Sequence, residues 1–296
     1  MEAAMATTRI TEAITDAYGF ASPGATIDEV RSGYDRSMSR AGLPSQVTVT
    51  EDKVAGVPGR WFEVADADVT VLFLHGGGYL FGSSVSHGPL AAHLAVAAVA
   101  RVFVADYRLA PENPYPAALD DARGALAELV SNAGPGTKVV VAGDSAGGGL
   151  ALATLLAAKA AGDPLPAGAV TFSAWTDLSL SSASLEERAH IDPFVDRVQL
   201  EVNAGAYLGE GNRRDPFVSP VFGDLAGLPP VHLQVGTEEV LHDDTTRFAQ
   251  RVLDAGGSAE VAVQEGMPHV HQILLGLLPE AGASIETAGA FIRGLR

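Results

Sequence analysis

Two patterns of hydrophobic and polar residues divide the chain near residue 69. Before that point, residues 1–44 place apolar side chains at helical spacing, and residues 47–54 and 60–64 alternate or cluster as short strands do. After it, short runs rich in β-branched residues are separated by alanine-rich stretches. The first part therefore predicts helices followed by two early strands, and the second part predicts alternating strands and helices.

The alternating part predicts one large sheet. We expect its strands at 69–74, 102–105, 138–142, 169–172, 231–235 and 260–263. We expect helices between and after them at 88–100, 116–132, 146–161, 244–255 and 281–294. Strands that alternate with helices form a parallel sheet whose two faces are both covered. The predicted fold class is therefore α/β, with a mostly parallel central sheet flanked by helices.

One segment interrupts this alternation. Residues 173–230 contain no run that predicts a strand. A connection of that length in a compact domain is usually functional. We therefore expect part of it to lie over a site as a lid.

Composition restricts the function further. With 47% hydrophobic residues in 296, the chain can bury a large core, and its net charge of −17 argues against nucleic acid and anionic membranes as partners. The absence of cysteine excludes thiolate nucleophiles, disulfides and cysteine-based zinc sites. No apolar stretch is long enough to span a bilayer, and the first residues lack a signal-peptide pattern, so we expect a cytoplasmic location.

The strongest chemical signal is a candidate nucleophile, Ser145. The pentapeptide 143–147, Gly-Asp-Ser-Ala-Gly, directly follows the strand expected at 138–142 and precedes the helix expected at 146–161. A sharp turn from strand to helix strains the serine backbone and exposes its hydroxyl at the sheet edge. The flanking glycines are needed because a Cβ there would collide with neighbouring backbone.

A second loop supplies candidate oxyanion-hole donors. His75-Gly76-Gly77-Gly78 follows the strand expected at 69–74, at the sheet edge where catalytic loops lie. Serine attack places negative charge on the substrate carbonyl oxygen, which preorganised N–H groups stabilise. We assign this role to Gly77 and Gly78, together with the N–H of Ala146, and expect His75 to hold the loop by a hydrogen bond.

The base and the acid of a triad should follow the last two strands. His269 lies in the turn after the strand expected at 260–263, and His271 is its alternative. The loop after 231–235 holds Glu239, which is placed to orient an imidazole, whereas Asp243 and Asp244 are typical of the N-cap and first turn of the next helix. We choose His269 and Glu239, and Asp243 stays open as the acid.

Together these motifs resemble the hormone-sensitive-lipase-like esterases, also called bacterial family IV. The similar segments are HGGGY at 75–79, DYRLAPENPYPAALDD at 106–121, GDSAGG at 143–148 and GMPH at 266–269. The resemblance spans about residue 40 to the C-terminus. It implies an α/β-hydrolase fold and a serine carboxylesterase without cofactor or metal. It also implies the same roles for Ser145, His269, Gly77, Gly78 and Ala146.

The chain departs from the family pattern in the acid loop. That loop usually reads Gly-x-x-Asp-Pro-Leu, whereas residues 236–241 here read Gly-Thr-Glu-Glu-Val-Leu. The match puts Glu239 at the acid position. Tyr107, Arg108 and Glu112 also match family positions, and we interpret them as structural, with a charged pair bracing the oxyanion loop.

The resemblance also implies a small helical cap. Its parts would be residues 1–44 and an insertion at 178–212, and the catalytic domain would comprise 45–177 and 213–296. A cap over the site predicts esters with short-to-medium acyl chains. The apolar side chains that we expect to face the acyl chain are Phe20, Phe194, Val195, Leu200 and Tyr207.

Other functions compete with this one. A lactone hydrolase would use the same triad. A receptor of this fold without catalysis typically loses the histidine, which is present here, and a metal hydrolase built on His269 and His271 lacks a third convincing ligand. We therefore expect a small-molecule ester or lactone as the partner, and the sequence leaves a homodimer open.

Overall fold

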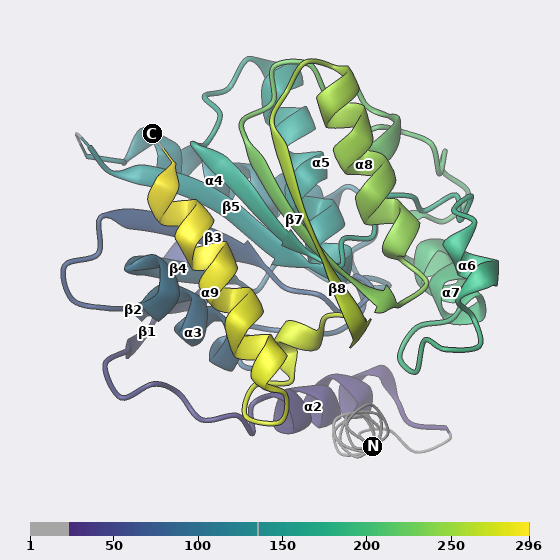
Figure 1. Cartoon of the computed structure of the whole chain (residues 1–296), viewed down its shortest axis with the longest axis horizontal. Helices are drawn as coiled ribbons and strands as arrows, with labels where there is room; N and C mark the ends of the chain where they lie inside the picture. Colours follow the sequence, from purple (N-terminus) through teal and green to yellow (C-terminus); the bar gives the residue numbers. More distant parts are fainter. Residues whose placement is uncertain (1–23, 135, 296) are drawn as a thin grey trace.

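An eight-stranded sheet forms the centre of the molecule (Figure 1). The computed structural model describes residues 24–134 and 136–295, so Phe20 and the rest of 1–23 lie outside the described residues. The strand order is β1-β2-β4-β3-β5-β6-β7-β8. The strands are β1 Thr48–Val54, β2 Val57–Glu63, β3 Val69–Leu74, β4 Ala100–Ala105, β5 Lys138–Asp144, β6 Gly168–Phe172, β7 Val231–Glu238 and β8 Ala259–Pro268. β2 pairs antiparallel with β1 and β4, and the strands from β4 to β8 pair in parallel.

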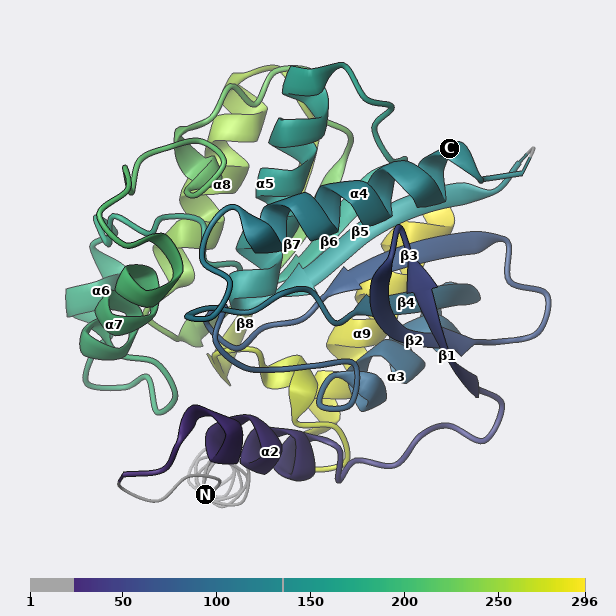
Figure 2. The same cartoon turned by 180° about the vertical axis from the view of Figure 1, so that it is seen from behind.

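Helices cover both faces of this sheet. α4 (Ala117–Ser131), α5 (Ser145–Ala161) and α8 (His242–Asp254) share one hydrophobic core, and α3 (Gly88–Ala98) and α9 (Pro279–Gly294) share the other. Figure 1 shows α9 on the near side of the sheet, and Figure 2 shows α4 on the opposite side. The predicted fold class is therefore confirmed.

β3 shows why the central strands have continuous apolar sequences. All six of its residues are buried, and successive side chains of a strand point to opposite faces. Leu72 and Leu74 belong to the core under α4 and α5, whereas Val71 and Phe73 belong to the core under α3 and α9. A strand buried on both faces needs apolar residues at consecutive positions, which is the pattern that the sequence carries.

The expected boundaries differ from the observed ones mainly at the C-terminal end of the sheet. β7 runs on to Glu238, and β8 continues to Pro268, where we had expected a turn at 266–269. The two strands stay paired up to Glu238 and Pro268 across an irregularity in register. This pairing extends the sheet edge that carries the candidate acid and base.

The segment 173–230 contains helices and, as expected, no strand among its residues, all of which the structure describes. Its elements are α6 (Ser184–Glu187), α7 (Arg197–Leu208) and a 3₁₀ turn, η1 (Pro220–Phe222). α2 (Ile27–Met38) begins with a capping box in which Thr26 and Glu29 bond each other's backbone N–H. α2 and α7 both contribute to the cavity described below.

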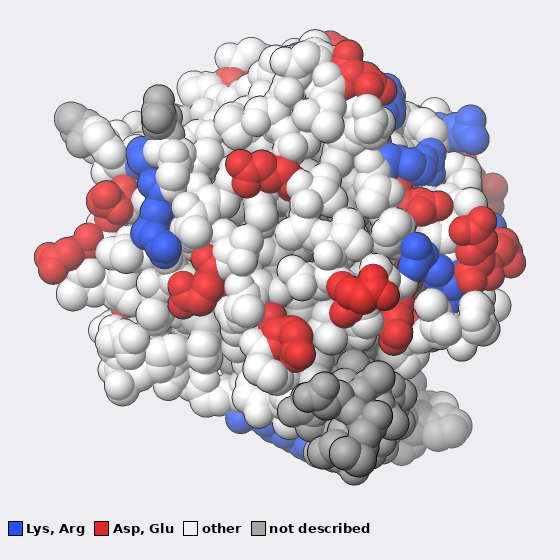
Figure 3. Space-filling view, in the orientation of Figure 1, with Lys and Arg blue, Asp and Glu red and all other residues white. Residues whose placement is uncertain are grey.

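Acidic and basic side chains are both present on the surface. On the face drawn in Figure 3, Asp and Glu are spread over much of the surface, and Lys and Arg lie mainly towards its two sides. Within the described part of the chain, no helix combines the length and the apolar character needed to cross a membrane.

Candidate active site

Ser145 occupies a strained turn between β5 and α5. Its backbone φ angle is +51°, in a region that residues other than glycine rarely adopt. A Cβ on Gly143 would lie 2.4 Å from the carbonyl oxygen of Gly147, and one on Gly147 would lie 2.1 Å from that of Leu74. Both glycines are therefore required for the strand and the helix to approach this closely, and the turn presents the hydroxyl of Ser145 to a cavity.

A chain of hydrogen bonds joins Ser145, His269 and Glu239. Oγ of Ser145 lies 2.9 Å from Nε2 of His269, and Nδ1 of the same ring lies 2.8 Å from Oε2 of Glu239. The other carboxylate oxygen of Glu239 accepts from the N–H of Gly236 at 2.6 Å and from the hydroxyl of Ser173 at 2.8 Å. Glu239 is fully buried, so these contacts fix which oxygen faces the ring.

The environment favours a charged imidazolium at His269. Burial lowers the pKa of His269, but the hydrogen bond that its ring donates to Glu239 and the negative charges of Glu239, Asp192 and Asp144 outweigh burial. The pKa of His269 is therefore raised above its ordinary value of 6.5. A base whose protonated form is stabilised can accept a proton from serine during attack.

The alternative base and the alternative acid lie elsewhere. Nε2 of His271 lies 2.8 Å from Oγ of Ser284, and burial lowers the pKa of His271 to about 4. Asp243 accepts from the N–H of Ser184 at 3.0 Å. The expectation that Asp243 caps α8 is wrong, because Leu241 is the N-cap residue and Asp243 lies in the first turn.

The glycine loop faces the hydroxyl of Ser145 across the cavity. Gly77 and Gly78 have φ of +112° and +61°, and both line this cavity. A Cβ added to Gly77 would lie 2.2 Å from the carbonyl oxygen of Phe81, and a Cβ added to Gly78 would lie 2.1 Å from Nδ2 of Asn203. Ala146, the second residue of α5, is buried beside Ser145. The structure thus brings together the three residues whose N–H groups we assigned to an oxyanion.

Buried polar groups hold the glycine loop by hydrogen bonds to the backbone of His75 and Gly76. Nδ1 of His75 lies 2.8 Å from the carbonyl oxygen of Gly76, and the Tyr107 hydroxyl donates to the carbonyl of His75 at 2.6 Å. Asp144 accepts from the N–H of Gly76 at 2.9 Å and lies 3.3 Å from Nε2 of His87. Asp144, the residue before Ser145, therefore connects the glycine loop directly to the turn that carries the candidate nucleophile, a role that the sequence did not suggest.

The expected charged pair between Arg108 and Glu112 is absent from the structure. Arg108 pairs with Asp121, and Glu112 pairs with Arg31 of α2. Arg31 also donates to the carbonyl oxygen of Leu80, just after the glycine loop. The brace on this loop is therefore long-range, and local sequence spacing could not reveal it.

The cavity at Ser145 is small, about 50 Å³. Of the apolar residues expected to face an acyl chain, Phe194, Val195 and Leu200 line it. Tyr207 does not line it. Its ring stacks on the ring of Tyr79 instead, with the two ring centroids 3.8 Å apart. The walls that we had not predicted include Tyr34, Phe81, Trp175, Asn203 and Ile273.

Two polar residues that we had not predicted support the candidate acid. The hydroxyl of Ser173 donates to Glu239 and accepts from the N–H of Val270 at 3.0 Å. Asp192 accepts from the N–H of Val240 at 2.8 Å, next to Glu239. The position of Ser173 directly after β6, at the same sheet edge as the other site residues, was the only available signal.

The described residues include no group of three or more His, Asp or Glu side chains that could hold a metal ion.

Comparison with known proteins gives consistent matches. A family described as alpha/beta hydrolase fold, Abhydrolase_3, matches residues 71–273. An acetyl-hydrolase of Streptomyces hygroscopicus is 42% identical over 271 residues, covering 90% of each chain, and an esterase of Acinetobacter venetianus is 33% identical over 251 residues, covering 84% of this chain and 83% of its own. A crystal structure of an esterase from the bacterial hormone-sensitive lipase family matches with a TM-score of 0.92 at 37% identity, covering 97% of this chain and 98% of that chain.

Proposed function

Because the chain belongs to the α/β-hydrolase family and resembles its hormone-sensitive-lipase-type esterases over nearly its whole length, we propose that it is a serine carboxylesterase acting through Ser145, His269 and Glu239. The observation that carries the proposal is the continuous hydrogen-bonded chain from Glu239 through His269 to Ser145, which ends at a cavity. Its substrates are esters with short-to-medium acyl chains.

The reaction follows from this geometry. His269 Nε2 removes the proton of the Ser145 hydroxyl while Oγ attacks the ester carbonyl carbon. The carbonyl π electrons move to oxygen, and the tetrahedral intermediate collapses as His269 returns the proton to the leaving alcohol. Water then repeats the sequence on the acyl-enzyme, which releases the acid and the free serine. Glu239 keeps the ring oriented and stabilises the imidazolium formed in each half.

Backbone N–H groups stabilise the charge that forms on the carbonyl oxygen. Gly77, Gly78 and Ala146 are the donors, and they are fixed before the substrate arrives. The contacts of Asp144 and Tyr107 hold the glycine loop in place. Removal of one such donor typically costs about 10²–10³-fold in kcat.

Two observations support a small acyl group. The cavity at Ser145 has a volume of about 50 Å³ and is bounded by Phe194 and Leu200. The relative that is 42% identical is an acetyl-hydrolase. We include acetyl esters among the substrates for this reason.

The test is Ser145→Ala, assayed with a short p-nitrophenyl ester. The variant should keep the folded state, measured by circular dichroism, and lose about 10⁶-fold in kcat, because no other group forms the acyl-enzyme. A folded Ser145→Ala protein that retains a tenth of wild-type turnover would refute the proposal.

A further inference from the structure

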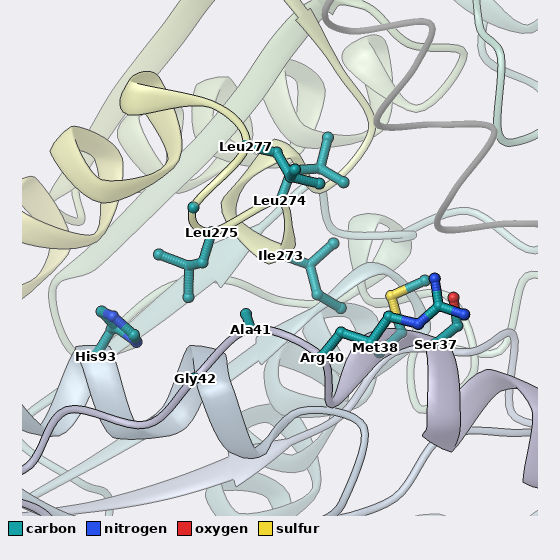
Figure 4. A pocket seen from close by; sticks show the side chains of 11 residues that line it. Ser37, Met38, Arg40, Ala41, Gly42, His93, Ile273, Leu274, Leu275 and Leu277 are labelled. Atoms are coloured by element: carbon teal, nitrogen blue, oxygen red, sulfur yellow. The ribbon is translucent and has the colours of Figure 1, made fainter.

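A second hollow lies beside the cavity at Ser145. It is bounded by the C-terminal end of α2 and by the loop that follows η2 (His271–Ile273), and its volume is about 400 Å³ (Figure 4). Apolar side chains make much of its wall, among them Met38, Ala41, Leu274 and Leu275. Volumes of this order are typical of sites for small organic molecules. This hollow is larger than the cavity in which the ester bond would be cleaved.

Ile273 belongs to the walls of both spaces. The two spaces are also neighbours along α2, since Tyr34 lines the cavity at Ser145 and Met38, one turn later, lines the hollow. Met38 and Leu274 are buried in the same hydrophobic core as Tyr34. The partition between the spaces therefore includes one half-buried aliphatic side chain, Ile273, set in a short 3₁₀ turn just after His269.

We propose that the hollow is a binding site for the hydrocarbon chain of longer esters and that Ile273 is the residue that limits access to it from Ser145. This inference rests on the proposed esterase function. The occupant is a hydrocarbon chain because the loop after η2 gives the wall three leucine side chains, Leu274, Leu275 and Leu277, beside Ile273. In Figure 4, Arg40 and Ser37 lie near Met38 at one end of this wall, and His93 lies at the other end. With Ile273 in place, the small cavity restricts the enzyme to short-to-medium chains.

Truncation of Ile273 should lengthen the preferred chain. The assay is kcat/KM for p-nitrophenyl esters of acetate, butyrate, octanoate and decanoate, each below the concentration at which it forms micelles. Each further methylene that enters an apolar site should raise kcat/KM about fourfold. Ile273→Ala should therefore increase the decanoate-to-acetate ratio by at least about tenfold, and Ile273→Val should increase it less. An unchanged ratio in both folded variants would overturn the proposal.

A second substitution tests whether the hollow receives the chain. Ala41 lines the hollow but not the cavity at Ser145. Ala41→Trp should fill the hollow, so adding it to Ile273→Ala should return the decanoate-to-acetate ratio to near the wild-type value. The matched control is Leu253→Trp in the same background, which adds an indole at a position of α8 that is 48% exposed. If the gain survives Ala41→Trp, the chain lies elsewhere and the proposal is wrong.

Acetate turnover separates this inference from the proposed function. Leu253→Trp alone should hydrolyse p-nitrophenyl acetate at a rate near that of the wild type. Because Ile273 also borders the cavity at Ser145, its variants are compared by the decanoate-to-acetate ratio and not by the acetate rate alone. Absence of acetate turnover in the wild-type protein would instead refute the esterase itself. A parallel series of alkyl acetates, from ethyl to decyl, varies the alcohol side of the ester instead of the acyl side. Only one of the two series should respond to Ile273→Ala, and that series identifies the side of the ester that enters the hollow. If neither series responds, the hollow is not a substrate site.

Discussion

At the scale of single residues, the site depends on which oxygen of Glu239 is free to face the imidazole. Gly236 and Ser173 occupy Oε1, so Oε2 is left for His269. The sequence could predict Ser145 and His269 because each lies beside a strand end in a recognisable motif. It favoured Glu239 but left Asp243 open, since the choice depends on the path of the loop after β7, next to its pairing with β8.

The choice of acid gives a direct pair of substitutions. Glu239→Gln keeps the shape of the side chain but removes the charge that stabilises the imidazolium, and a comparable change in a serine triad costs about 10⁴-fold in kcat. We expect Glu239→Gln to lose at least two orders of magnitude in kcat. Asp243→Asn, whose side chain bonds Ser184, should stay within about threefold of the wild type. The opposite result in steady-state kinetics would place the acid at Asp243.

The pH dependence follows from His269. Since the base must be neutral to accept the serine proton, activity should fall as the pH drops through the pKa of His269, which is raised above 6.5. Glu239 supplies the two largest factors that raise this pKa, its hydrogen bond with the ring and its negative charge, and Glu239→Gln removes the charge. The acid limb of kcat/KM in Glu239→Gln should therefore move to lower pH, whereas His271→Asn should leave the limb in place. A limb that moves in His271→Asn and not in Glu239→Gln would contradict the assignment.

At the scale of elements, the central strands were predictable and the insertion was not. Strands such as β3 are buried on both faces, so their apolar runs mark them in the sequence. α7 buries Leu200, Ala204 and Tyr207 at helical spacing, but Val198 and Val202 on the same helix are 73% and 61% exposed. Apolar residues on both faces obscure the helical pattern, so the periodicity suggested only a lid, and its helical character was implied by the family resemblance alone.

Asp244 shows how an element is held in place by a buried carboxyl group. It accepts from the N–H groups of Thr176 and Asp177 and from the hydroxyl of Ser182, which fastens the segment after β6 to α8. Asp244→Ala would leave these donors buried and unpaired, at about 1–3 kcal/mol each.

We therefore expect Asp244→Ala to lower the free energy of unfolding by at least about 3 kcal/mol in denaturant titration. Asp243→Ala, in the same turn of α8, is the control and should cost about 1 kcal/mol. Equal losses in the two variants would show that the buried hydrogen bonds of Asp244 add nothing to the free energy of unfolding beyond what Asp243 contributes.

At the scale of the whole molecule, two regions far apart in sequence meet over Ser145. Tyr34 of α2 and Phe194, Leu200 and Asn203 of the segment after β6 line the same cavity. The division into a cap at 1–44 and 178–212 and a catalytic domain remains a prediction. Sequence periodicity identifies elements, but it does not say which of them close over a site, because that depends on long-range contacts such as the bond from Arg31 to Leu80.

A small cavity of this kind limits the substrate. We expect the highest turnover for acyl chains of about four to eight carbons and no increase in rate when the substrate forms micelles, since a finite pocket does not present an open lipid-binding surface. Rates measured across the solubility threshold of a triglyceride, where an oil–water interface first forms, check this expectation. A sharp increase at that threshold would show that the covering elements open at a lipid surface.

Covalent trapping of the nucleophile tests the central claim most directly. Incubation of the full-length protein with an organophosphate, followed by peptide mass spectrometry, should add one phosphoryl group to the peptide that contains Ser145, with loss of esterase activity in proportion to labelling. Ser145→Ala should remain unlabelled, and His269→Ala should be labelled far more slowly. Stoichiometric labelling at another serine, or full inactivation with Ser145 unmodified, would contradict the assignment of Ser145 as the nucleophile.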